Sequence, residues 1–172
     1  PVGTDIRAYL GLDDTLFTIK LTPTRADCLI LTGVAREVAV ITGGEFRAPA
    51  IEPFPPSIDT RRDIVLDVPQ ACPRYCGRIL RGVDARAATP DWMVRRLVRS
   101  GLRSISALVD ITNYVMLELG QPLHAFDNTK LQGAIHVRYP QEGEQVLLLN
   151  EQTVTPAADT LLIADEARAL AL

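Results

Sequence analysis

The sequence is poor in the residues that usually bind metals or act as nucleophiles. It has three cysteines and two histidines among 172 residues. Cys72 and Cys76 form one loose pair that contains Pro73, whereas a structural zinc site normally needs two close pairs of ligands. An odd number of cysteines favours reduced thiols, as in the cytoplasm, over a disulfide framework. We therefore expect no metal site in this chain.

Other signatures are missing too. There is no G-x-S-x-G nucleophile elbow, and Gly43–Gly44 marks a helix end, not a phosphate-binding loop. No apolar run is long enough to cross a bilayer. The net charge is −3, so the chain lacks the excess of Lys and Arg that neutralises nucleic-acid phosphates. We expect no membrane span and only weak nucleic-acid binding by this chain alone.

Aromatic residues are scarce at 5%, so aliphatic side chains must fill the core, for which a hydrophobic share of 47% is sufficient. The length suits one or two domains. The chain begins at Pro1 and ends in the apolar run "RALAL". Both ends look cut, and we expect a piece of a longer protein.

The first fifty residues predict a strand followed by a helix. Residues 15–23 alternate as a strand does. A helical stripe ends at Gly43 and contains Leu31, Val34, Ala35, Val38 and Ile41. Residues 48–59 then contain four prolines, which favour neither helix nor central strand. We interpret 48–59 as a linker between two domains.

After the linker, residues 63–68 and 76–83 predict strands, and a helix follows from about residue 90. Thr89 is the expected N-cap, Pro90 lies in the first turn, and Gly101 ends the helix. Its non-core face carries Arg95, Arg96, Arg99 and Arg103. We favour a solvated face for these arginines over a phosphate-binding track. Ser100, Ser104 and Ser106 cluster at the next junction, where capping is the ordinary explanation.

A second helix is predicted over about 105–119, and strands follow from residue 134. The helix stripe is apolar except for Thr112. Residues 134–139, 160–165 and 168–172 read as strands, and 145–154 as a hairpin turning at Asn150–Glu151. Two helices among several strands predict an α+β fold, with a mixed or antiparallel sheet layered with helices.

Thr112, Asn113 and His124 admit two interpretations. In the first, the threonine bonds back to the Leu108 carbonyl, the asparagine is a surface amide, and the histidine caps the chain after Pro122. In the second, the helix and the returning loop meet, and the three side chains line a polar notch in an apolar wall. A few convergent polar groups in an apolar pocket are typical of a small-molecule site.

The stretch "RSISALVDITNYVMLELGQPLHAFD" (103–127) resembles the beta subunit of bacterial phenylalanyl-tRNA synthetase. "TRADCLILTGVAREVA" and "TLLIADEARALAL" resemble further segments of that family, in the same order. The resemblance implies that 1–47 ends the N-terminal beta-subunit region and that 60–172 begins the tRNA-editing module. Thr24 and Ile30 depart from the Asn and Ser expected there.

The resemblance also implies a function. The whole cytoplasmic enzyme joins phenylalanine to tRNA(Phe) with ATP and Mg²⁺, as a heterotetramer of two alpha and two beta subunits. Its synthetic centre lies on the alpha subunit, while the beta subunit hydrolyses mischarged tyrosyl-tRNA. Thr112, Asn113 and His124 match editing-pocket positions, and His124 is the catalytic candidate. We expect no cofactor in this chain and an incomplete pocket, because the family continues beyond residue 172 into further strands.

Two other functions stay open at this point. The chain can serve as a non-catalytic structural or subunit-contact module, or as a plain RNA-binding domain. Release of tyrosine from tRNA separates the first from an editing module. A steep salt dependence of binding is expected for the second.

Overall fold

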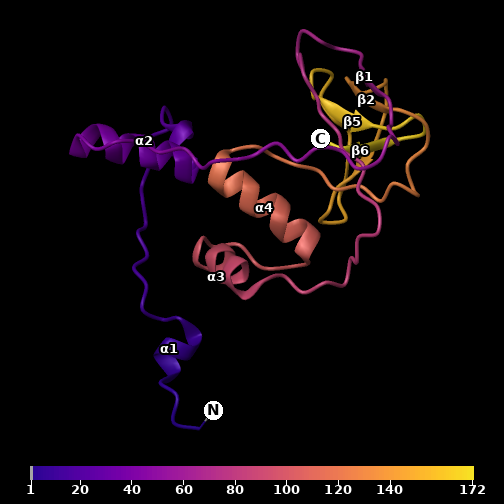
Figure 1. The fold of residues 1–172 in the computed structure, drawn as a ribbon. Helices are drawn as coiled ribbons and strands as arrows, with labels where there is room; N and C mark the ends of the chain where they lie inside the picture. The colour runs from indigo at the N-terminus through magenta and orange to yellow at the C-terminus, as the bar shows by residue number, and fades with distance from the viewer. Residues whose placement is uncertain (1) are drawn as a thin grey trace. The chain divides into compact units, whose positions relative to one another are not determined.

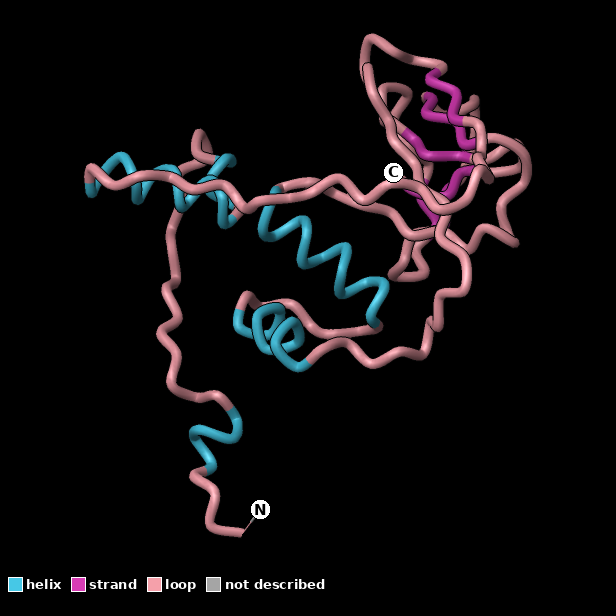
Figure 2. The backbone as a smooth tube through the Cα atoms, viewed as in Figure 1, coloured by secondary structure: helices cyan, strands magenta, loops and turns pink. Residues whose placement is uncertain are grey.

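The computed structural model describes residues 2–172, which divide into two compact units (Figures 1 and 2). The first unit comprises the residues up to Ile51 together with Asp84–Ala125, and the second comprises Glu52–Val83 and Phe126–Leu172. The two units are groups of residues that contact one another, and their limits differ from those of the predicted domains. The limits of 1–47, 48–59 and 60–172 therefore stay a prediction.

The first unit is helical (Figure 1). Its elements are α1 (Ile6–Leu10), the short 3-10 helix η1 (Ala26–Leu29), α2 (Leu31–Thr42), α3 (Asp91–Arg99) and α4 (Ala107–Leu119). Helices α3 and α4 pack against each other, and α2 contacts both η1 and α4. Both helices predicted between residues 90 and 119 are thus confirmed, as is the helix that ends at Gly43.

The strand predicted over residues 15–23 is wrong. This segment has no regular structure, and its apolar side chains are exposed, Phe17 at 82%. A strand needs a neighbouring backbone to bond with. The first unit offers none, because every element described in it is a helix. The alternation of apolar and polar residues in this segment is therefore not sufficient to form a strand.

The helix ends show which side chains cap them. Gly43 and Gly120 close α2 and α4 in the left-handed conformation, with φ of 69° and 79°. Ser106 caps α4 by accepting a hydrogen bond from the backbone N–H of Val109, as predicted. The predicted N-cap of α3 is wrong: α3 begins at Asp91, so the N-cap position is Pro90, and the Thr89 side chain instead donates a hydrogen bond to Asp110.

The second unit contains the strands (Figure 2). One sheet has the order β1-β2-β5-β6, formed by Ile64–Leu66, Ile135–Arg138, Leu162–Ala164 and Ala169–Ala171. The β1–β2 pair is parallel and the other pairs are antiparallel. A separate hairpin pairs β3 (Val146–Leu147) with β4 (Thr153–Val154). The mixed sheet, together with the helices of the first unit, confirms the α+β class. The β3–β4 pair confirms the hairpin near Asn150.

The core of the second unit lies on the sheet. Ile135, Val137 and Ile163 are buried and form its centre. The strand predicted over 76–83 is wrong, because this segment joins no ladder and Leu80 is 66% exposed. Its apolar run resembles that of β1, but only β1 pairs with a neighbouring strand, through Ile64 and Ile135.

Candidate functional site

Thr112 and Asn113 lie together near the middle of α4, and both are half-buried. The Thr112 hydroxyl donates to the carbonyl of Val109 at 2.8 Å, one residue beyond the Leu108 carbonyl that we expected. This bond leaves the hydroxyl oxygen able to accept a hydrogen bond from a ligand. Among the described residues, no side-chain hydrogen bond is recorded for the Asn113 amide, so it too has capacity for a ligand.

His124 follows α4 in the loop that leaves the left-handed turn at Gly120. Its side chain is exposed. The structure thus brings Thr112 and Asn113 onto one helical turn and leaves the imidazole accessible. The convergence of all three residues on one cavity stays a prediction.

Asp110 fixes the beginning of the helix that carries these residues. It is completely buried. Its carboxylate accepts the hydroxyl protons of Thr89 and Ser104 and the backbone N–H of Ile105. Burial by itself raises the pKa of Asp110, but the hydrogen bonds from Ser104, Thr89 and the backbone together lower it below its usual value. The carboxylate therefore stays ionised and ties the segment before α3 to the start of α4.

Sequence reasoning missed Asp110, although a signal was present. The residue is an acid inside an apolar helical run, two positions before Thr112, and hydroxyl residues precede it at Ser104 and Ser106. A buried carboxylate needs donors of this kind. The periodicity of apolar residues does not by itself indicate such donors.

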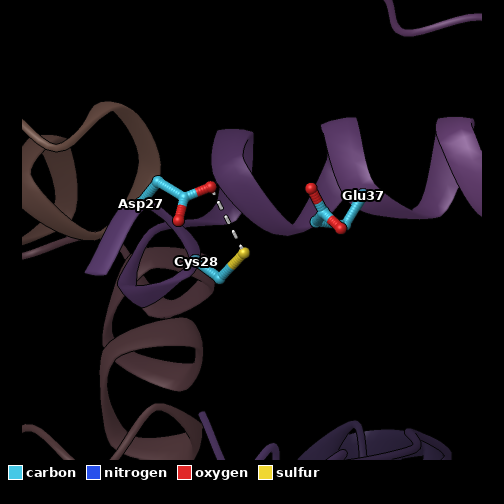
Figure 3. Close-up of side chains that lie close together, drawn as sticks. All are labelled: Asp27, Cys28 and Glu37. Atoms are coloured by element: carbon cyan, nitrogen blue, oxygen red, sulfur yellow. Dashed lines mark hydrogen bonds between the residues drawn. The ribbon is translucent and has the colours of Figure 1, made fainter. Parts of the chain in front are cut away.

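A cluster of acidic and sulfur ligands occurs at η1 and α2. Figure 3 shows Asp27, Cys28 and Glu37, whose possible ligand atoms all lie within 4.8 Å of one another. Three such donors within this distance can hold a metal ion. Sequence reasoning did not single out this cluster, because its members come from two elements.

Arg25 already occupies the position of a cation in this cluster. Its guanidinium donates to both Asp27 oxygens at 2.9 and 3.0 Å, to the Cys28 sulfur at 3.1 Å and to Glu37 at 2.5 Å. These hydrogen bonds lower the pKa of Asp27 to about 2, while burial raises the pKa of the Cys28 thiol. We interpret the cluster as an ion-pair network that joins η1 to α2, and not as a metal centre.

The second unit has a polar cavity of about 940 Å³. Its lining includes His136, Arg138, Glu144 and Asp165. These groups are already paired: His136 Nδ1 lies 3.0 Å from the Asp67 carboxylate, and Arg138 forms two hydrogen bonds with Glu144. The Arg138 hydrogen bonds lower the pKa of Glu144 to about 2. The cavity contains none of the three predicted site residues.

No helix in the described range 2–172 combines the length and apolar character needed to cross a membrane. Cys28, Cys72 and Cys76 are all free thiols.

Comparison with known proteins identifies the family. Residues 71–172 match the model of the B3/4 domain. Over all 172 residues the chain is 76% identical to a phenylalanine--tRNA ligase beta subunit of Aromatoleum aromaticum. The corresponding subunits of Dechloromonas aromatica and Neisseria meningitidis serogroup A are 62% and 56% identical over the same length.

The chain spans about a fifth of the length of these curated relatives, 22% in each case. The family model covers more than half of the chain and includes β2, β5, β6, α3, α4 and all three candidate site residues. The chain therefore belongs to the B3/4 domain family, in the form found in bacterial phenylalanine--tRNA ligase beta subunits.

Proposed function

We propose that this chain contributes to the hydrolytic editing of tyrosine wrongly attached to tRNA(Phe), within the beta subunit of a phenylalanine--tRNA ligase. The observation that supports the proposal is the pair of half-buried polar side chains, Thr112 and Asn113, on a mostly apolar helix anchored by a buried carboxylate. The accessible His124 follows this helix after four residues.

The chemistry explains why a second, polar site is needed. Tyrosine differs from phenylalanine by one hydroxyl group, and an apolar pocket rejects an added hydroxyl only by about a hundredfold. A site that hydrogen-bonds this hydroxyl discriminates against the analogue that lacks it by roughly ten-thousandfold or more. Editing therefore needs polar groups that can hydrogen-bond this hydroxyl, and in this proposal α4 supplies them.

The ester between the amino acid and the terminal ribose is activated, so water held in position can hydrolyse it. The imidazole of His124 can both donate and accept a hydrogen bond, which suits it to orient the water or a ribose hydroxyl. The Asn113 amide can donate to the developing oxyanion. Attack of water breaks the ester bond and releases tyrosine and tRNA with the hydroxyls of its terminal ribose free.

The remaining roles belong to the whole enzyme. ATP and Mg²⁺ serve the attachment of phenylalanine, which we assign to the alpha subunit of a heterotetramer of two alpha and two beta subunits in the cytoplasm. The chain described here supplies no group to that step in this proposal. Its partners are the alpha subunit and the acceptor end of tRNA(Phe).

We expect the His124→Ala substitution in the full-length ligase to slow hydrolysis of tyrosyl-tRNA(Phe) by at least about tenfold, because removing a group that positions the reacting water typically has an effect of this order or larger. Attachment of phenylalanine should be unchanged. The measurement is the rate of tyrosine release from preformed tyrosyl-tRNA(Phe), alongside the charging rate.

His136→Ala is the matched control, because His136 is the other histidine of the chain and pairs with Asp67 in the second unit. It should leave tyrosine release within about twofold of the wild-type rate. An unchanged rate in His124→Ala would remove this residue from the site. Unchanged rates in His124→Ala, Thr112→Val and Asn113→Ala together would favour the alternative of a non-catalytic structural module.

A further inference from the structure

An exposed cluster of two aromatic rings and one guanidinium lies on the helices α3 and α4. Trp92 and Tyr114 contact each other edge to face, with 5.3 Å between ring centroids and an interplanar angle of 88°. The Arg96 guanidinium carbon lies 5.3 Å from the Trp92 ring centroid and 6.0 Å from that of Tyr114. Trp92 keeps 45% of its surface exposed.

The cluster is held in place by its own hydrogen bonds. Arg96 donates to the Tyr114 hydroxyl at 2.6 Å, and this hydroxyl donates to Glu118 at 3.3 Å. Both bonds fix the phenol ring, and the ring in turn supports Trp92. A large indole surface therefore stays open to solvent at low entropic cost, because the groups beneath it are already ordered.

The α3 segment that carries Trp92 and Arg96 is positive although the whole chain is negative, and Glu118 on α4 is the acidic group bonded to the cluster. Residues 91–103 contain four arginines against one aspartate, so their net charge is +3, whereas that of the chain is −3. Arg99 is neutralised by Asp14. For Arg95 and Arg103 no ion pair is recorded among the described residues, and both side chains are exposed. The predicted solvated face thus agrees with the exposure of Arg95, Arg96 and Arg103, whereas Arg99 is half-buried in its ion pair with Asp14.

An exposed aromatic ring in contact with an arginine, on a helix rich in arginine, fits an unpaired nucleotide. Bases stack on aromatic rings and on guanidinium planes, and nearby cations attract the phosphates. We propose that Trp92, Arg96 and Tyr114 form a stacking platform for an unpaired nucleotide near the 3′ end of tRNA. This inference rests on the proposed function, because tRNA is its ligand. The platform shares helix α4 with the editing residues, and Tyr114 follows Asn113 directly.

Trp92 is the single tryptophan of the chain, so its emission, excited selectively over the four tyrosines, reports on the platform. The probe is a single-stranded RNA ending in CCA, and a blunt RNA hairpin without unpaired ends is the comparison. We expect the single strand to quench Trp92 emission and the hairpin to have little effect, because stacking requires an unpaired base.

Variants test the same contact in a second way. With fluorescently labelled RNA, Trp92→Ala should weaken binding of the single strand by about tenfold, within the range reported for loss of one base stack. Trp92→Phe should bind within about threefold of wild type. Phe54→Ala is the matched control, because Phe54 is an aromatic residue of the second unit that is 79% exposed. Arg103→Gln should lower the slope of log affinity against log salt concentration by about one, the change expected for one lost phosphate contact.

Three results would overturn the platform: no detectable binding of single-stranded RNA, binding without any change in Trp92 emission, or equal binding by Trp92→Ala and Phe54→Ala. A change in emission caused only by the purified alpha subunit would assign this surface to a protein contact instead. Loss of editing in His124→Ala combined with any of these results would leave the proposed function intact and reject the platform.

Discussion

Replacing Asp110 with alanine is expected to destabilise the first unit by about 4 kcal/mol. Asp110 is fully buried, and three donors point to its carboxylate. Each donor left without a partner in the interior destabilises a protein by about 1–3 kcal/mol. Partial relaxation of the Thr89 and Ser104 hydroxyls keeps the total below the sum of the three. Urea unfolding followed by circular dichroism measures the difference.

Asp91→Ala is the matched control, because Asp91 is an exposed aspartate in the first turn of α3. Its loss should destabilise by less than about 1 kcal/mol, the usual size of a helix-dipole interaction. Similar losses for both variants would show that the Asp110 hydrogen bonds contribute little. If Asp110→Ala does not fold, Asp110→Asn keeps the side-chain volume and supplies the comparison.

The pH dependence provides an independent test of the same carboxylate. The pKa of Asp110 is lower in the folded chain than its usual value. Its ionised form therefore stabilises the fold above the unfolded pKa of about 3.9, and this contribution is lost as the pH falls through the lower folded value. The stability difference between wild type and Asp110→Asn should shrink as the pH is lowered below about 4.

Gly33→Ala is expected to destabilise the packing of α2 on η1 by about 3 kcal/mol. A Cβ atom added at Gly33 would lie 1.7 Å from the carbonyl oxygen of Asp27, far inside van der Waals contact. Because this atom belongs to the backbone, η1 must move. Helix propensity acts in the opposite direction and favours alanine by up to about 1 kcal/mol. Since overpacking has the larger effect, the net change is a loss.

Ala35→Gly provides the control for Gly33→Ala, since Ala35 is an exposed residue of the same helix. It changes only the propensity and should destabilise by about 1 kcal/mol. The readouts are urea unfolding and the alkylation rate of Cys28, which is buried in η1, in a chain with Cys72 and Cys76 replaced by serine. Stabilisation of the chain by Gly33→Ala, or unchanged protection of Cys28, would contradict this packing.

The sequence predicted the elements that have strong local signals. The stripe that ends at Gly43 and the Ser106-to-Gly120 segment both form helices, because periodicity and capping act within a few residues. The hairpin at Asn150–Glu151 forms as predicted, with Glu151 at a φ of 65°. The resemblance of residues 103–127 to a known family also agreed with the comparison over the whole chain.

The failures occurred where the outcome depends on distant partners. Residues 15–23 and 76–83 alternate like strands but have no neighbouring strand to pair with. Thr89 was predicted to cap α3, but the N-cap position is Pro90 and the Thr89 hydroxyl donates to the distant Asp110. The Trp92–Arg96–Tyr114 cluster joins two helices, and no spacing within either helix predicts it. Tertiary contacts of this kind override local propensity.

The central claim is that Asn113 and His124 act on the same substrate, and a double-mutant cycle in the full-length ligase tests it most directly. The rate of tyrosine release from tyrosyl-tRNA(Phe) is measured for wild type, Asn113→Ala, His124→Ala and the double variant. We predict that the double variant is little slower than the slower single variant, because residues that act as a unit lose activity non-additively. Independent, multiplicative losses, or no loss in either single variant, would contradict the claim.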